Sequence, residues 1–202
     1  MISSIHEYLE LIPLLEAQQG VLLHSDLEVF WEGGSAQTLQ NRINLFASEG
    51  VLRKVCRGVY VGRSFNPWML ASRMYPDCVI STVSVLAKSA FVGTAPTEQV
   101  WCTRIGKSRD HFSKGIAVHA WSLDPFLMTF GIEFQGAIRV ATPEKAFLDT
   151  LHFHLHGRTY PFSIPNDIDL DRLDHERIEE YLLHYKNRRF RTFANGILHG
   201  TK

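Results

Sequence analysis

Apolar residues follow helical spacing over most of the first 50 positions. Four of them form a stripe that predicts a first helix over residues 4–18: Ile5, Leu9, Ile12 and Leu15. Either Ser25 or Asp26 can cap a short second helix that ends at Phe30. The Gly33–Gly34 pair then predicts a turn. Two helices and a turn are therefore expected ahead of a third helix.

The third helix has both of its ends marked in the sequence. Ser35 can cap its start, because the serine hydroxyl accepts a backbone N–H of the first turn. Gly50 can end it, because glycine enters the left-handed region without a Cβ clash. Its apolar face is predicted to consist of Leu39, Ile43 and Phe46.

The opposite face of this helix is polar and mostly neutral. It carries Gln37, Asn41, Asn44 and Ser48, with Thr38 and Arg42 on its flanks. Side-chain amides present paired donors and acceptors, which suit base edges in a major groove. The residues expected to read or flank bases are Gln37, Thr38, Asn41 and Arg42, and Ser35 is expected to hold a phosphate.

A two-stranded wing is predicted directly after the third helix. Its strands are Val51–Val55 and Val59–Val61, joined by a turn at Cys56–Gly58. Three cations lie on this hairpin, where they can meet phosphates: Arg53, Lys54 and Arg57. Helix, helix, turn, helix and wing is the order of a winged helix-turn-helix, so residues 1–63 are predicted to form a DNA-binding domain of that class.

A second domain is predicted for residues 64–202. Asn66 caps a helix that begins at Pro67 and ends near Tyr75, and a further helix is expected over Ser81–Phe91. The spacing of apolar residues then changes toward two. The predicted strands are Gln99–Thr103, Ile116–Trp121, Phe130–Phe134, with a bend or bulge at Gly131, and Ala137–Ala141.

Helices return after these strands. Thr142 and Pro143 mark a sharp helix start, and Gly157 marks its end. A last helix or helix pair is expected over Leu173–Leu198. The whole chain is thus predicted to be α+β: a winged helix-turn-helix followed by an α+β domain with a small, mostly antiparallel sheet.

Charge is balanced overall but uneven along the chain. The net charge is zero. Residues 1–34 hold six acidic residues and no Lys or Arg, whereas residues 35–63 hold five cations against Glu49 alone. Positive charge is therefore concentrated on the predicted recognition helix and wing. Three scattered cysteines, no apolar run of membrane-spanning length and no signal-peptide pattern predict a cytoplasmic protein without membrane contact.

Several segments together resemble one known family. They are Arg57–Val61, Val79–Ser81, Gly131–Glu133 and, as the most specific, Ala141–Asp149 with the sequence ATPEKAFLD. On these segments, residues 20–190 or so resemble the AbiEi antitoxins of type IV toxin–antitoxin systems. The resemblance implies a winged helix that represses its own operon and a C-terminal domain with antitoxin activity. It also implies a functional partner, a nucleotidyltransferase-like toxin of the AbiEii type.

Metal and catalytic interpretations compete with plainer ones. His152 and His156 share one helical face, with His154 between them, but local spacing fixes no third ligand, so no metal site is predicted. Helix-start chemistry explains Glu144, and the four-residue spacing of Lys145 and Asp149 fits a polar helix face. We therefore predict no catalytic residues and no cofactor. Trp101, Trp121 and Phe134 alternate on strands and are expected in the core.

The second domain carries two further basic groups. One is a predicted loop with Arg104, Lys107, Arg109 and Lys114, and the other is the last helix with Arg188, Arg189 and Arg191. Each could contact nucleic acid or an acidic partner surface, or could be a solvated face.

The function predicted from the sequence is repression by binding double-stranded DNA at the gene's own promoter, coupled to antitoxin activity. Three alternatives stay open: a nuclease delivered to DNA by the winged helix, a solitary regulator without a toxin, and a helix-turn-helix that docks protein. The sequence does not define the oligomeric state.

Overall fold

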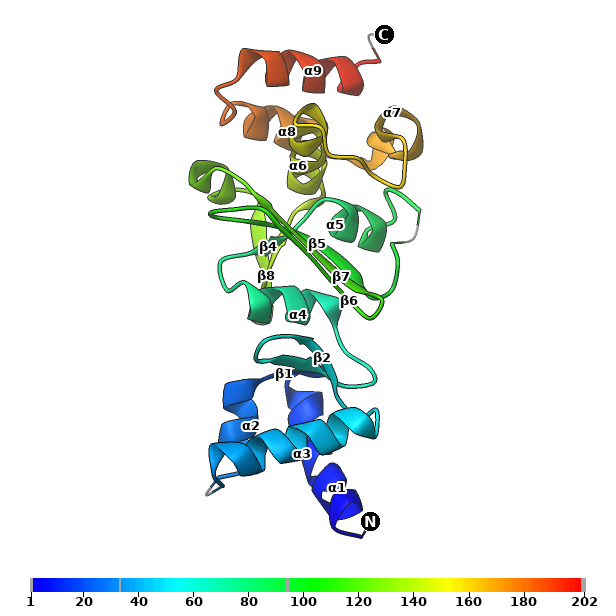
Figure 1. Cartoon of the computed structure of the whole chain (residues 1–202). Coiled ribbons are helices and arrows are strands. Elements are labelled where there is room, and N and C mark those ends of the chain that lie inside the picture. The colour runs from blue at the N-terminus through cyan, green and yellow to red at the C-terminus, as the bar shows by residue number, and fades with distance from the viewer. Residues whose placement is uncertain (1, 33, 94, 201–202) are drawn as a thin grey trace. The chain divides into compact units, whose positions relative to one another are not determined.

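The computed structural model describes residues 2–32, 34–93 and 95–200 (Figure 1). The chain forms two compact units. The first takes in the chain up to Pro76 together with Phe112–Ile116, and the second takes in Asp77–His111 and the chain from Ala117 onward. The first unit therefore includes the helix that was expected to open the second domain. No helix of the described ranges is long and apolar enough to cross a membrane.

The first unit combines helices with a small antiparallel sheet. Its elements are α1 (Ile2–Ala17), β1 (Val21–Leu23), α2 (His24–Phe30), α3 (Ala36–Ser48), β2 (Arg53–Cys56), β3 (Val59–Val61) and α4 (Pro67–Met74). The strand order is β1-β3-β2, and both pairings are antiparallel. Strand β1 was not predicted, because three apolar residues are too few to show an alternating pattern.

Helix α3 has the ends and the buried face that its sequence predicts. The Ser35 hydroxyl accepts the backbone N–H of Thr38, and Gly50 follows the helix at φ +69°. The apolar stripe is buried: Leu39, Ile43 and Phe46 pack with residues such as Leu11, Leu22, Leu27 and Leu52. This packing fixes α3 against the rest of the unit. Of the predicted Gly33–Gly34 turn, Gly33 lies outside the described residues.

Helix α4 is tied to the first unit by Arg73. Its guanidinium forms an ion pair of 2.7 Å with Asp26 of α2 and donates to the carbonyl of Val21 at 3.0 Å. It also donates to the side-chain oxygen of Gln18. The Asn66 side chain caps α4, as predicted, and donates to Gln19 at 2.6 Å. These contacts explain why the compact unit continues to Pro76.

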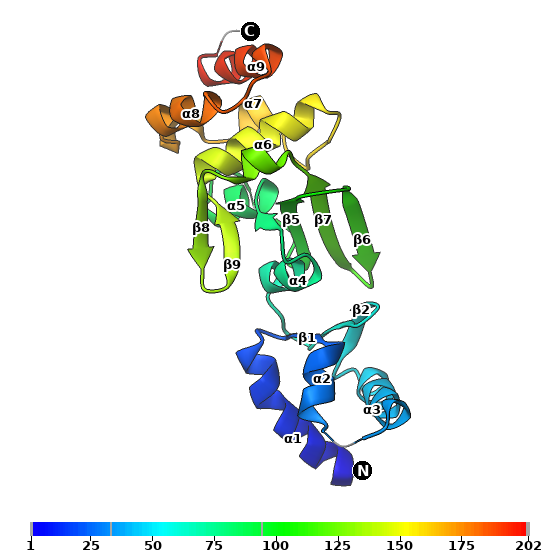
Figure 2. The same cartoon turned by 90° about the vertical axis from the view of Figure 1, so that its left-hand side faces the viewer.

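The second unit is built on a six-stranded sheet, of which Phe112, Ser113 and Ile116 are grouped with the first unit. Its elements are β4 (Val79–Ile80), α5 (Val83–Lys88), β5 (Gln99–Arg104), β6 (Arg109–Ser113), β7 (Ile116–Ser122), η1 (Pro125–Met128), β8 (Ile132–Gln135), β9 (Ile138–Ala141), α6 (Pro143–Leu155), α7 (Ile164–Asp167), η2 (Leu170–Arg172), α8 (His175–Leu182) and α9 (Arg188–Leu198). The strand order is β6-β7-β5-β4-β9-β8, which puts β6 and β8 at the sheet edges (Figure 2).

The sheet is mixed, so the expectation of a small, mostly antiparallel sheet was wrong. β4 pairs with β9 and β5 pairs with β7 in parallel, whereas β4–β5 and β8–β9 are antiparallel. Strands β4 and β6 were missed. β4 has only two residues, and β6 is a polar strand that contains Arg109 and Asp110. Parallel partners are distant in sequence, and no local pattern identifies them.

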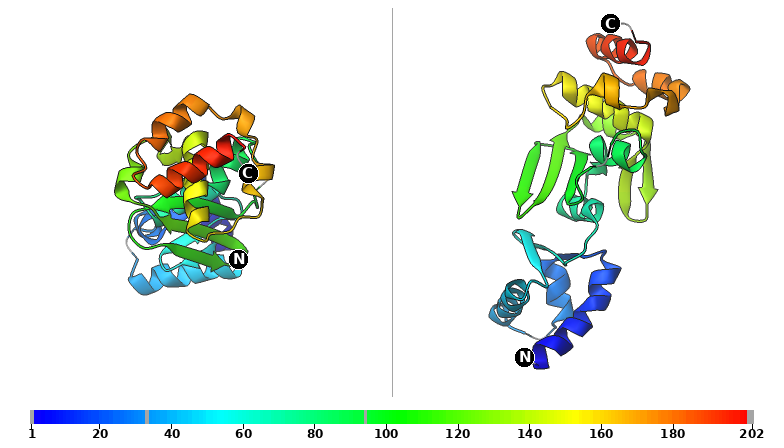
Figure 3. Two further views of the ribbon diagram at one scale, coloured as in Figure 1. Left: turned by 90° about the horizontal axis from the view of Figure 1, so that it is seen from above. Right: turned by 90° about the vertical axis from the view of Figure 1, so that its right-hand side faces the viewer.

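Helix α6 is the central helix of the second unit. It packs against α5, β9, α8 and α9. Figure 3 shows α6 between the sheet and the C-terminal helices α8 and α9. Thr142 caps α6 by accepting the backbone N–H of Lys145 at 3.3 Å, and Gly157 follows its end at φ +82°. Both ends of this helix were predicted correctly.

Lys145 and Asp149 do not form the predicted polar helix face. They are 2% and 1% exposed and form an ion pair inside the second unit. The Ser81 hydroxyl donates to the second Asp149 oxygen at 2.7 Å. Burial lowers the pKa of Lys145, and the neighbouring Asp149 carboxylate opposes this shift. Glu144 is also buried, with one carboxylate oxygen 3.7 Å from Arg177.

Gly131 leaves room for this ion pair. A Cβ at position 131 would lie 2.8 Å from the Cβ of Lys145 and 2.9 Å from the ring of Tyr181. Its φ of +63° also favours glycine. The bend predicted at Gly131 therefore has a packing cause.

Candidate nucleic-acid interface

The polar face of α3 is exposed as predicted. Gln37, Asn41, Asn44 and Ser48 all face solvent, on the side opposite Leu39 and Phe46. Ser35 and Thr38 are exposed at the start of the helix, and their hydroxyls lie 3.0 Å apart. Because the Ser35 hydroxyl also caps the helix, a phosphate bound there would have to share that oxygen.

Four amides on α3 are paired along the helix axis. The amide nitrogen of Gln37 donates to the Asn41 oxygen at 3.0 Å, and that of Gln40 donates to the Asn44 oxygen at 2.8 Å. Each pair is separated by four residues, the spacing of neighbours on a helix surface. The remaining groups of this pair are the side-chain amino group of Asn41 and the side-chain carbonyl of Gln37. Neither has a side-chain partner among the described residues. They can bind an outside ligand while the pair stays intact.

Arg42 has partners within the first unit. Its guanidinium lies 3.8 Å from a carboxylate oxygen of Glu7 and 5.7 Å from the ring centre of Trp31. The side chain therefore helps to hold α3 against α1 and α2. A base contact by Arg42 stays a prediction, and it would have to compete with these two partners.

The three cations of the β2–β3 hairpin differ in their surroundings. Arg53 is half-buried and stacks over the ring of Phe65 at 5.5 Å. Lys54 is exposed on β2, and Arg57 is exposed in the turn that Gly58 completes at φ +75°. Lys54 and Arg57 are thus better placed than Arg53 to meet a phosphate.

Salt bridges reduce the acidic character of the first unit. Of the six acidic residues between positions 1 and 34, Glu7 pairs with Arg42, and Asp26 pairs with Arg73. The exposed cations of the hairpin therefore face less opposing charge than a count along the sequence suggests.

The basic loop predicted around residues 104–114 is not one loop. Arg109 lies on strand β6, which separates Lys107 before it from Lys114 after it. Arg104 is held by Asp77 at 3.7 Å and donates to the carbonyl of Lys107 at 3.2 Å. The sequence of β6 is so polar that it looked like a loop. In contrast, Arg188, Arg189 and Arg191 are all exposed on α9, as predicted.

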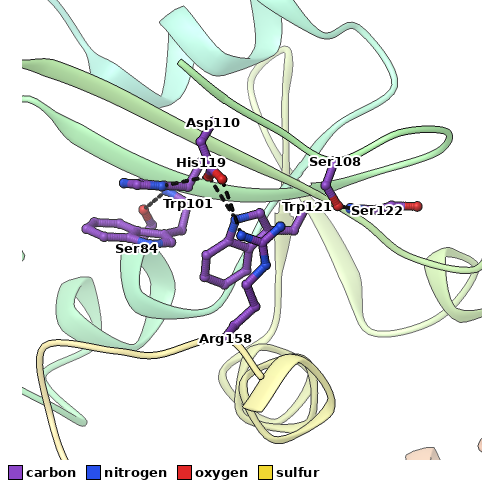
Figure 4. Close-up of polar contacts among 8 residues, drawn as sticks. All are labelled: Ser84, Trp101, Ser108, Asp110, His119, Trp121, Ser122 and Arg158. Carbon is purple, nitrogen blue, oxygen red and sulfur yellow. Dashed lines mark hydrogen bonds and ion pairs between the residues drawn. The ribbon is translucent and has the colours of Figure 1, made fainter. Parts of the chain in front are cut away.

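A polar cluster in the second unit was not predicted from the sequence (Figure 4). The Asp110 carboxylate lies 2.9 Å from His119 Nδ1, accepts from the Trp121 indole nitrogen at 3.0 Å and pairs with Arg158 at 3.3 Å. Burial raises the pKa of Asp110, but the hydrogen bonds with His119 and Trp121, together with the charges of His119 and Arg158, lower it overall.

Aromatic contacts extend this cluster across neighbouring strands of the sheet. Arg158 lies over the Trp121 ring at 4.9 Å, and Trp101 stacks on His119 at 4.7 Å. The nearby Ser84 hydroxyl accepts the backbone N–H of Trp101 at 2.8 Å. The only sequence signal was the two-residue spacing of His119 and Trp121, which puts both on one face of β7. Trp101 and Trp121 are buried as expected, but Phe134 is 72% exposed, so its predicted place in the core was wrong.

The histidines of α6 have separate surroundings. The His152 and His156 rings are 4.4 Å apart, and His156 Nδ1 lies 2.7 Å from the His152 carbonyl oxygen. The His154 ring instead stacks with that of Phe193. Burial, and next the neighbouring His156, lower the pKa of His152 to about 4. Among the described residues, no three His, Cys, Asp or Glu side chains are grouped to hold a metal ion.

Comparison with known proteins identifies a similar fold and no family. No protein-family model and no curated protein sequence matches the chain. Among solved structures, the chain is similar to the RV2827C protein from Mycobacterium tuberculosis, with a TM-score of 0.59 and 13% sequence identity. The match covers 94% of this chain and 74% of that one. At this level of identity, the likeness shows the α+β fold alone.

The lowered pKa of His152 predicts a loss of stability in acid. In the unfolded chain this histidine takes up a proton near its usual pKa of 6.5, whereas in the folded protein it does so only near 4. Stability should therefore fall as the pH drops from 6.5 to 4 and should not depend on this group above 6.5. Denaturant titrations at pH 7 and pH 5 should show that His152→Phe removes roughly 2 kcal/mol of this loss. If the stability of the parent and that of His152→Phe fall equally between pH 7 and pH 5, His152 is not the cause of the loss.

Proposed function

We propose that this protein is a DNA-binding transcriptional repressor whose first unit is a winged helix-turn-helix. The element order α1-β1-α2-α3-β2-β3, with a sheet ordered β1-β3-β2, fits that class. In this proposal α3 enters the major groove, and the β2–β3 hairpin lies along the phosphate backbone. Repression follows because the bound protein occupies the promoter of its own gene.

The observation that carries the proposal is the exposed, amide-paired face of α3. Gln37 presents a carbonyl and Asn41 an amino group side by side near the start of the helix, where recognition helices contact bases. An asparagine amide can bond bidentately to adenine. The amide pairs also stabilise the helix surface, so what supports base contact is the donor and the acceptor that the Gln37–Asn41 pair leaves exposed.

We further propose that the protein is the antitoxin of a type IV toxin–antitoxin system and is not an enzyme. This part rests on the sequence resemblance to AbiEi antitoxins, above all in the segment Ala141–Asp149. The partner would be a nucleotidyltransferase-like toxin. The buried position of Lys145 and Asp149 speaks against a catalytic use of that segment, because a substrate could not reach them.

Replacing the exposed hairpin cations should weaken DNA binding at every sequence. For Lys54→Ala with Arg57→Ala, the slope of log affinity against log salt should become shallower by about 0.9 for each phosphate that the protein no longer neutralises. A gel-shift series in rising salt on the gene's own promoter measures this slope. Lys88→Ala, which removes a cation from α5 in the second unit, should leave it unchanged. An unaltered slope in the double variant would exclude the hairpin from the interface.

Asn41→Ala should relax the choice of bases. If Asn41 reads one base pair directly, discrimination at that position should fall by about 1–3 kcal/mol, while binding to random DNA stays similar. Binding sites selected from a random library by each protein supply the comparison. Ser48→Ala is the matched control, because its hydroxyl lies on the same face but donates to the Leu45 carbonyl at 2.7 Å. If Asn41→Ala and the parent select identical sites, Asn41 does not read bases.

Repression and antitoxicity should be separable in the full-length chain. The Lys54→Ala, Arg57→Ala variant should no longer repress the promoter and should still rescue growth when a nucleotidyltransferase toxin encoded beside the gene is co-expressed. A promoter reporter and a growth assay in the same cells measure both effects. If the double variant loses rescue as well as repression, antitoxicity depends on DNA binding. Repression without rescue by the parent protein would identify a solitary regulator and refute the antitoxin proposal.

A further inference from the structure

A cavity opens between α6, η1 and the junction of α8 with α9. Its volume is about 330 Å³, which lies within the range of pockets that hold small molecules. Every residue that lines it lies between Asp124 and Phe190, in the second unit. None of the α3 and hairpin residues proposed above to contact DNA lines it, whereas Arg189, one of the exposed cations of α9, does.

The walls of this cavity are largely aromatic. Phe126, His152, His184, Tyr185 and Phe190 all line it. The Tyr185 and Phe190 rings stack with their centres 4.4 Å apart, and the centres of the Phe126 and His184 rings are 5.8 Å apart. His152 is uncharged at neutral pH, because burial lowers its pKa to about 4. Flat aromatic rings around a cavity favour a planar ligand that stacks against them.

The charges at the cavity favour an anion. Lys186 and Arg189 line it, are exposed, and have no carboxylate within ion-pair distance among the described residues. The Lys186 ammonium lies 5.8 Å from the centre of the Phe126 ring, which places a cation directly beside the aromatic wall. Asp124 is the one carboxylate of the described lining, and it already accepts the Phe126 backbone N–H at 2.8 Å.

We propose that this cavity binds a small aromatic anion, that is, a planar ring system that carries a phosphate or a carboxylate group. The ring lies against the exposed Phe126, beside the buried Tyr185 and Phe190. The anionic group lies toward Lys186 and Arg189, where either a phosphate or a carboxylate can accept charge-assisted hydrogen bonds.

Titration calorimetry on the full-length protein tests this proposal with four probes. 2-Naphthyl phosphate and 2-naphthoate carry both the ring and the charge, 2-naphthol carries the ring alone, and inorganic phosphate carries the charge alone. One or both naphthyl anions should bind with one site per chain. The uncharged ring and the free ion should each bind at least about tenfold more weakly. Comparison of the two anions shows whether phosphate or carboxylate is preferred.

A matched pair of charge variants locates the site. Lys186→Gln with Arg189→Gln should weaken binding of the naphthyl anion at least about tenfold. Arg188→Gln with Arg191→Gln removes the same charge from α9 outside the cavity and should leave affinity unchanged. All four side chains are exposed, so both variants should unfold at the parent's temperature, which a thermal scan checks.

Four outcomes would overturn the proposal. They are no saturable binding of either naphthyl anion, equal affinity for 2-naphthol, equal affinity for inorganic phosphate, and equal weakening by the two double variants. Each would mean that the ring and the two cavity cations do not act together on one ligand. No DNA is present in these titrations, so their failure would leave the repressor proposal intact.

Discussion

The interior of the second unit depends on keeping one ammonium group and one carboxylate together. Lys145 and Asp149 are both removed from water, and each alone would cost several kcal/mol of desolvation. Their mutual attraction and the hydrogen bond from Ser81 offset that cost only in one geometry. Ser81 follows β4, whereas the ion pair lies on α6. The hydrogen bond from Ser81 to Asp149 therefore links the helix to the residue that follows β4, with a directionality that apolar contacts lack.

Other features of the second unit follow from this position of α6. Gly131 has no side chain where Lys145 and Tyr181 pass, and so the chain can turn into β8 beside the helix. α8 and α9 also pack on α6, and the aromatic cavity lies where they meet it. His152 lies about one turn beyond Asp149 on the same helix, in the wall of the cavity.

Local signals in the sequence predicted several helix ends, and non-local ones were missed. The expected cap of the second helix was wrong, because α2 begins at His24, ahead of Ser25 and Asp26. Ser35, Asn66 and Thr142 were identified as caps because a cap depends only on the next three residues. The strand partners of β4 could not be identified, because β5 and β9 reach it from distant parts of the chain. Lys145 and Asp149 were misplaced for a related reason. Opposite charges four residues apart usually mark a helix surface, and only the tertiary fold shows that this turn is buried.

In the candidate site, too, the features of single helices were predictable and the contacts between elements were not. The exposed amides of α3 followed from helical periodicity, but the contacts of Arg42 with Glu7 and Trp31 join residues far apart in sequence. The Asp110 cluster and the cavity gather side chains from several elements, and no spacing rule links Asp110 to Arg158 or Phe126 to Phe190. Sequence patterns describe the faces of single elements, whereas these sites exist only where elements meet.

The paired amides of α3 have a consequence for how such a protein can diverge. Gln37 with Asn41 and Gln40 with Asn44 face solvent, while Leu39, Ile43 and Phe46 hold the helix from the other side. The residues that would choose a DNA sequence and those that maintain the fold are therefore different sets on one helix. Under the proposed function, a duplicated gene could acquire a new operator through two or three exchanges among these amides. Its core, its caps and the aromatic cavity would pass unchanged into both descendants.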